Sequence, residues 1–92
     1  MLFRSYDGEN NSDTYNELSL CYVAEDDFAE AKKCLMKAFE IEPESTKIIS
    51  NLGFIAMKQG NNEEARKYFT AALEIDPKDQ VAATYLLQLE KE

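Results

Sequence analysis

The stretches KAFEIEPES (Lys37–Ser45) and AALEIDPKD (Ala71–Asp79) are two versions of one phrase. Each carries its proline, Pro43 or Pro77, directly after an apolar run that ends in an acidic residue. Proline has no amide hydrogen, fixes φ and restricts the residue before it, so a helix ends at that point. The phrase therefore predicts the same helix end twice.

The similarity extends backwards from the two prolines. Segments 12–45 and 46–79 align without a gap at a period of 34 residues, and small residues stay small while large ones stay large. The matching pairs are Leu18 and Leu52, Ser19 and Gly53, Ala31 and Ala65, Leu35 and Phe69, Ala38 and Ala72, and Ile41 and Ile75. A fixed period of this size indicates stacked supersecondary units, because one unit alone cannot bury its apolar face.

Segment 46–79 predicts two helices on either side of Gly60. Apolar residues recur with helical spacing from Ile48 to Ala56 and again from Ala65 to Ile75. Gly60 suits the end of the first helix, because glycine accepts the left-handed backbone found there. The expected N-caps are Ser45 or Thr46 for the first helix and Asn61 or Asn62 for the second.

Segment 12–45 has the same two patterns with a different turn. Its turn is Glu25-Asp26-Asp27 and contains no glycine. Aspartate is a preferred N-cap, so Asp26 or Asp27 is expected to cap the second helix of this unit.

The two ends of the chain differ from the repeated units. Segment 80–92 carries apolar residues at the spacing of one amphipathic helix, which is expected to cover the last apolar face of the stack. Segment 1–11 is expected to be either a tail or the end of a preceding helix, with Leu2, Phe3 and Tyr6 covering the first unit in the second case.

Charge and composition exclude several functional classes. The net charge of −8 disfavours nucleic-acid binding, which needs a basic surface. Segment 12–45 holds most of the net negative charge, and a basic partner would be attracted there. Its nine acidic residues, against Lys32, Lys33 and Lys37, are Asp13, Glu17, Glu25, Asp26, Asp27, Glu30, Glu40, Glu42 and Glu44. No apolar run approaches the roughly 20 residues that span a bilayer, so no membrane contact is expected.

The motifs of catalysis and metal binding are missing from the sequence. There is no histidine, glycine-rich phosphate loop or nucleophile motif, and the acidic turn around Asp26 lacks the spacing of a calcium loop. We therefore expect no enzymatic activity, no cofactor and no metal. Cys21 and Cys34 form no disulfide framework or zinc pattern, which favours free thiols in a reducing, cytoplasmic setting.

Both units resemble the tetratricopeptide repeat. Segment 12–45 supplies Tyr15, Leu18, Ser19, Tyr22, Ala31, Leu35, Ala38 and Pro43, and segment 46–79 supplies Ile49, Leu52, Gly53, Ala56, Ala65, Phe69, Ala72 and Pro77. The departures are Ile49 for the usual tryptophan, Ala56 for the usual tyrosine and Leu35 for the usual aromatic residue. The resemblance implies an all-α fold, an α-solenoid of two helical hairpins with a C-terminal capping helix.

The resemblance also implies a binding groove, because the first helices of such units line a concave surface. The positions carried over are Asn16, Leu20, Val23, Lys47, Asn51, Phe54, Met57, Val81 and Tyr85. Helical spacing independently places Ser50, Phe54 and Met57 on one face. Asn51 matches a family asparagine that holds peptide backbone. Members of the family that grip a terminal carboxylate use lysine and arginine, whereas Asn16, Leu20, Val81 and Tyr85 stand at such positions here.

These features predict a protein-interaction module that binds a peptide or helical segment with apolar anchors and some basic character. Three alternatives stay open. The apolar stripe can be packing between neighbouring helices, the chain can be a homodimer that pairs through its exposed faces, or it can be a regulatory part of a larger enzyme.

Overall fold

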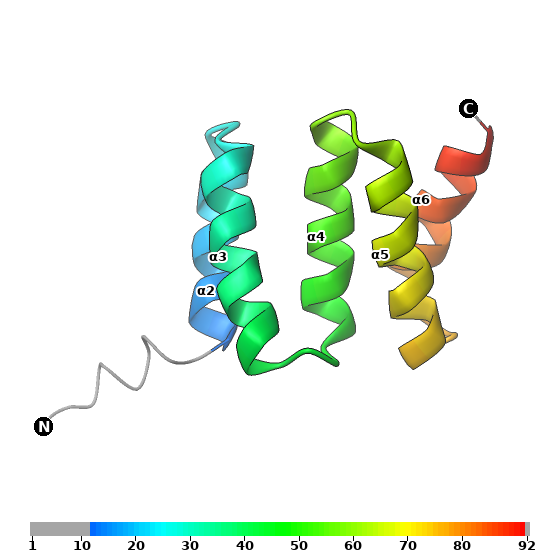
Figure 1. Ribbon diagram of the computed structural model, residues 1–92, viewed down its shortest axis with the longest axis horizontal. Helices are drawn as coiled ribbons and strands as arrows, with labels where there is room; N and C mark the ends of the chain where they lie inside the picture. The colour runs from blue at the N-terminus through cyan, green and yellow to red at the C-terminus, as the bar shows by residue number, and fades with distance from the viewer. Residues whose placement is uncertain (1–11, 92) are drawn as a thin grey trace, which may run out of the picture. The chain divides into compact units, whose positions relative to one another are not determined.

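The computed structural model describes residues 12–91, which form five helices and no strand within that range (Figure 1). The helices are α2 (Ser12–Ala24), α3 (Phe28–Ile41), α4 (Thr46–Lys58), α5 (Asn62–Ile75) and α6 (Gln80–Lys91). The expected all-α class is confirmed, while the expectation for segment 1–11 lies outside the described residues. The helices belong to two units, one ending at Pro43 and one beginning at Glu44.

The repeat is visible in the helix ends. Every bound of α4 and α5 lies 34 residues after the matching bound of α2 and α3. Glu42 and Asp76 have nearly the same backbone, with φ of −132° and −134°, and each amide donates to the carbonyl oxygen four residues earlier. Pro43 and Pro77 follow directly. The repeated phrase therefore ends a helix twice, because the residue before a proline is driven out of the helical region.

The turn in the first unit uses aspartate where the second unit uses glycine. Asp26 has a left-handed φ of 62°, and the matching Gly60 has a φ of 84°. Asp27 is the N-cap of α3, and its carboxylate accepts the Glu30 amide at 3.3 Å. Of the two expected caps, Asp27 is thus the one that bonds, and Asp26 provides the reversal of the chain.

The turn in the second unit follows the expectation for Gly60. The Gly60 amide donates to the Met57 carbonyl oxygen at 3.1 Å, and the Asn61 amide donates to the Ala56 carbonyl oxygen at 2.8 Å. These bonds satisfy carbonyls that the end of α4 leaves without helical partners. Ser45 is the N-cap of α4, with its hydroxyl accepting an amide at 3.5 Å.

The first unit is a hairpin of α2 and α3 whose core comes mainly from α3. Ala31, Leu35 and Ala38 are completely buried there. The buried face of α2 is instead polar, made of Ser12, Asn16 and Ser19. The Ser19 hydroxyl donates to the Asn16 carbonyl oxygen at 2.5 Å, and the Ser12 hydroxyl donates to the Glu42 carboxylate. These bonds let the polar face lie in the interior.

The leucines of α2 lie outside this core. Leu18 was expected at a helix contact because it matches Leu52, but its exposed fraction is 43%, against 1% for Leu52. Within the described part of the first unit, α2 packs only against α3, so one of its sides has no neighbour. Ile41 and Ile75, expected on the apolar faces, are also largely exposed at the ends of α3 and α5.

The second unit packs α5 against both α4 and α6. Its buried hydrophobic residues are Ile48, Ile49, Leu52, Ile55 and Ala56 from α4, Ala65, Phe69 and Ala72 from α5, and Ala82 and Leu89 from α6. Leu87 of α6, which departs from the small residue of the repeats, remains 58% exposed. None of the helices within residues 12–91 has the length and apolar character needed to cross a membrane.

Candidate functional site

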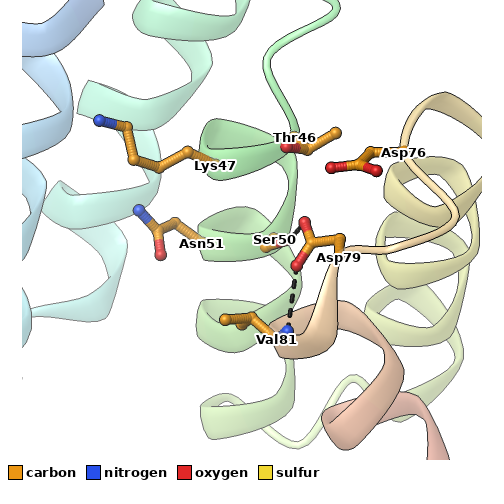
Figure 2. Close-up of a pocket in the computed structure, with 7 residues that line it drawn as sticks. All are labelled: Thr46, Lys47, Ser50, Asn51, Asp76, Asp79 and Val81. Carbon is orange, nitrogen blue, oxygen red and sulfur yellow. Dashed lines mark hydrogen bonds between the residues drawn. The ribbon is translucent and has the colours of Figure 1, made fainter.

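A hollow of about 320 Å³ lies in the second unit, beside the first turns of α4 and the entry to α6 (Figure 2). Its lining residues are Thr46, Lys47, Ser50, Asn51, Asp76, Asp79 and Val81. Three of them, Lys47, Asn51 and Val81, belong to the predicted groove. The hollow is therefore one place where the structure brings predicted residues from two helices together.

Asp79 builds one wall of this hollow. One carboxylate oxygen accepts the amides of Val81 and Ala82 at 3.0 and 3.2 Å, and the other accepts the Ser50 hydroxyl at 3.3 Å. Asp79 therefore caps α6 and ties its start to α4. Ser50, expected on the exposed groove face, is buried by this contact. Sequence reasoning did not single out Asp79, although an aspartate directly before a helical pattern is an N-cap signal.

Lys47 and Asn51 form the opposite side of the hollow. They lie one turn apart on α4, and Figure 2 shows both side chains leaving the helix on the side away from Asp76 and Asp79. Lys47 is exposed and Asn51 is half-buried. The amide of Asn51 carries both a donor and an acceptor, so it can pair with either group of a peptide backbone.

Aromatic rings continue the surface further along α4. The ring of Phe54 lies 5.7 Å from that of Tyr85, and Tyr85 stacks on the buried ring of Phe69 at 5.4 Å between centroids. The Lys58 ammonium lies 5.5 Å from the Phe54 ring centre. Phe54 and Tyr85 are half-buried. Tyr85 therefore contacts rings from both α4 and α5, and Phe54 and Tyr85 both stay partly exposed.

The other two apolar groove residues predicted in the second unit are Met57 and Val81. Met57 is half-buried on α4, and Val81 is 53% exposed in the first turn of α6. A methionine side chain adapts to irregular shapes, so Met57 suits a contact with a partner. The predicted residues of this unit thus provide a hollow bordered by Lys47, Asn51 and Val81, followed by partly exposed apolar residues along α4.

The first unit holds three of the predicted residues, all on α2. Leu20 is 50% exposed and Val23 is half-buried, as a binding surface requires. Asn16 is buried instead and offers little area to a partner. Asn16 was placed in the groove by the family resemblance, and a matching position does not show which neighbours bury a side chain.

The two thiols lie in different surroundings. Cys21 is exposed and Cys34 is buried, and both are free. Burial raises the pKa of the Cys34 thiol above its ordinary value, and the nearby Glu30 carboxylate raises it further against the opposing effect of Lys37. Within residues 12–91, no three metal-ligating side chains gather into a possible ion site.

Comparison with known proteins supports the fold described above. The tetratricopeptide repeat family model matches residues 22–89. The chain is 32% identical over 56 residues to TPR repeat-containing protein PA4667 of Pseudomonas aeruginosa, covering 61% of this chain and 10% of that protein. It is 26% identical over 82 residues to Protein O-mannosyl-transferase F38B6.6 of Caenorhabditis elegans, covering 89% and 12%. The chain thus spans about a tenth of the length of these curated relatives.

A solved structure shows the same fold. The second TPR domain of the human RPAP3 protein, determined by NMR in complex with the HSP70 peptide SGPTIEEVD, has a TM-score of 0.85 to this chain at 21% identity. The match covers 91% of this chain and 70% of that one. The family model spans residues 22–89, which is most of the sequence. The chain therefore belongs to the tetratricopeptide repeat family.

Proposed function

We propose that this chain is a non-catalytic protein-interaction module, which binds a peptide or helical segment of a partner along the first helices of its repeats. The observation that carries the proposal is the α4–α6 side of the second unit. Lys47, Asn51 and Val81 line a hollow there, and the partly exposed Phe54 and Met57 lie further along α4. A solvent-exposed combination of this kind is typical of binding surfaces.

The repeat scheme is part of this proposal. Segments 12–45 and 46–79 act as repeats, segment 80–92 as the capping helix, and Leu20 and Val23 extend the binding surface onto the first repeat. The RPAP3 domain of the same fold is described in complex with a peptide, which supports a peptide as the class of ligand. The free thiols fit a reducing, cytoplasmic setting.

The partner we expect carries apolar anchors and basic character. Val81 and Met57 can receive aliphatic side chains, Asn51 can pair with backbone, and the acidic first repeat attracts positive charge. A terminal carboxylate is disfavoured, because Leu20, Val81 and Tyr85 stand where carboxylate-gripping members of the family carry cations. The peptide SGPTIEEVD is therefore a negative control.

The absence of catalysis also remains a proposal. The worm relative is named a transferase, but this chain matches only 12% of that protein. The sequence here has no histidine, which removes the commonest general base. A repeat segment can accompany a catalytic region in a longer protein without taking part in its chemistry.

The test is selection of a phage-displayed peptide library on the immobilised chain, followed by fluorescence titration of the selected peptide. Val81→Glu should weaken binding by about tenfold or more, because a carboxylate replaces an apolar contact. The substitution is compatible with folding, because negative charge suits the first turn of α6. Thr70→Glu, exposed on α5, is the matched control and should bind as the wild type does.

Two outcomes would contradict the proposal. In the first, no binding peptide is selected from the library. In the second, Val81→Glu and Thr70→Glu weaken binding of the selected peptide equally. Light scattering over a range of concentrations tests the homodimer alternative, which predicts a mass that grows with concentration.

A further inference from the structure

The most buried residues of helix α2 are polar, its tyrosines Tyr15 and Tyr22 are half-buried, and its leucines are exposed. Its buried residues are Ser12, Asn16 and Ser19, while Leu18 and Leu20 are 43% and 50% exposed. A helix usually turns its apolar side to the core and its polar side to water. Leu18 and Leu20 are therefore available for contact with another molecule.

One side of this exposed surface lies apart from the proposed groove. Thr14, Leu18 and Cys21, which we term the outer face of α2, are all exposed and follow one another at helical spacing. None of these three belongs to the groove residues, and the exposed Glu17, which matches the groove residue Asn51, lies at the border between the two surfaces. A ligand bound here would therefore be additional to the one in the groove.

The matching face in the second repeat is buried. The α4 residues that match Thr14, Leu18 and Cys21 are Ile48, Leu52 and Ile55, each only 1% exposed. The same three helical positions are thus buried in one repeat and open in the other. Helical side chains at this spacing form a ridge that packs into the groove of another helix.

Charge identifies the kind of helix that fits. The helix α2 carries Asp13 and Glu17 and no lysine or arginine. The turn directly after it adds Glu25, Asp26 and Asp27. Negative charge therefore borders the exposed leucine, so a complementary partner is basic. A second copy of α2 would bring like charges together.

We infer that the outer face of α2 docks a basic amphipathic helix of a partner protein. Leu18 and Cys21 contact the apolar side of that helix, and Glu17 and Glu25 pair with its lysine or arginine residues. The surface is separate from the groove of the proposed function, and neither requires the other to be occupied.

The probe is a synthetic amphipathic peptide of leucine and lysine, with a second peptide that has glutamate in place of every lysine. Binding is followed by fluorescence anisotropy and by alkylation of Cys21 with iodoacetamide. The exposed Cys21 should be protected by the lysine peptide, and the buried Cys34 serves as the internal reference. The glutamate peptide should neither bind nor protect.

Two variants on the outer face and one control variant on α6 test where the peptide binds. Leu18→Glu should weaken binding of the lysine peptide by about tenfold or more. Leu87→Glu makes the same change at a leucine that is 58% exposed on α6, and should leave binding within about twofold of the wild type. Cys21→Arg is a second variant on the outer face and should weaken binding as Leu18→Glu does. All three change exposed residues, and circular dichroism verifies their folding.

Three results would overturn the inference. Equal losses in Leu18→Glu and Leu87→Glu would show unspecific adsorption to an acidic chain. Unchanged alkylation of Cys21 in the saturated complex would place the peptide elsewhere. A wild-type dimer that Leu18→Glu converts to a monomer would make a second copy the occupant. Val81→Glu tests the groove independently, so failure of one proposal leaves the other standing.

Discussion

The ring of Phe69 leaves no room for a side chain at Gly53. A β-carbon added at Gly53 would lie 2.8 Å from Cε1 and 2.9 Å from Cζ of Phe69. The ring is completely buried and stacks on Tyr85, so it has little freedom to move away. The first repeat has Ser19 and Leu35 at the matching places, both completely buried. A larger residue on one helix is thus matched by a smaller one on the other.

Gly53→Ala should lower the free energy of unfolding by about 1–3 kcal/mol, because the added methyl group overpacks the contact with Phe69. The double variant Gly53→Ser with Phe69→Leu copies the pair of the first repeat and should be more stable than Gly53→Ser alone. Urea denaturation measures both differences. Additive effects of the two substitutions would show that the residues do not share one contact.

Asp26→Gly should raise the free energy of unfolding by about 0.5–1 kcal/mol, because glycine adopts the left-handed backbone without the strain of a β-carbon. The converse change, Gly60→Asp, should lower it. No atom lies within 4 Å of a β-carbon added at Gly60, so its effect reports the backbone alone. Thermal denaturation of the two variants checks the prediction, which fails if both shift the midpoint in the same direction.

Asp79→Ala should destabilise the chain by about 0.5–2 kcal/mol, because it removes the N-cap of α6. Asp79→Asn keeps an acceptor for the amides of Val81 and Ala82 and should cost less. The measurement is the denaturation midpoint together with helicity from circular dichroism. If Asp79→Asn and Asp79→Ala were equally destabilised, the negative charge would matter more than the capping hydrogen bonds.

Cys34 should react with iodoacetamide more slowly than Cys21, because it is buried and its raised pKa lowers the fraction of reactive thiolate. Mass spectrometry of partly alkylated chain, with each cysteine assigned after proteolysis, measures the two rates. Faster modification of Cys34 would contradict its placement in the core of the first unit.

The raised pKa of Cys34 also predicts a dependence of stability on pH. The folded state holds the thiol proton more tightly than the unfolded state, whose pKa lies near the ordinary value of 9.0. This contribution is fully present below that value and is lost as pH rises through the folded pKa. The urea midpoint of the wild type should therefore fall more steeply above about pH 9 than that of Cys34→Ala. Parallel curves would exclude Cys34 as a source of the dependence.

Part of the exposure expected from the sequence was correct, and the corrections share one cause. The family resemblance placed Leu20, Phe54 and Val81 in a groove, and the structure leaves all three at least partly exposed. The resemblance also suggested exposure for Asn16, and helical spacing suggested it for Ser50, but both residues are buried. A helical period separates the faces of a helix, but whether a face meets solvent depends on elements distant in the chain, such as Asp79 for Ser50.

The sequence by itself determined the repeat, the four helices of the two hairpins and their ends. These depend on local chemistry, namely the proline after each helix pair, the capping serine and aspartate, and the apolar period. Only the tertiary structure decided that Asp26 takes the left-handed backbone, that Tyr85 stacks on Phe69, and that Leu18 is exposed where Leu52 is buried. Matching positions of a repeat have the same local chemistry but different neighbours, and burial is a property of the neighbours.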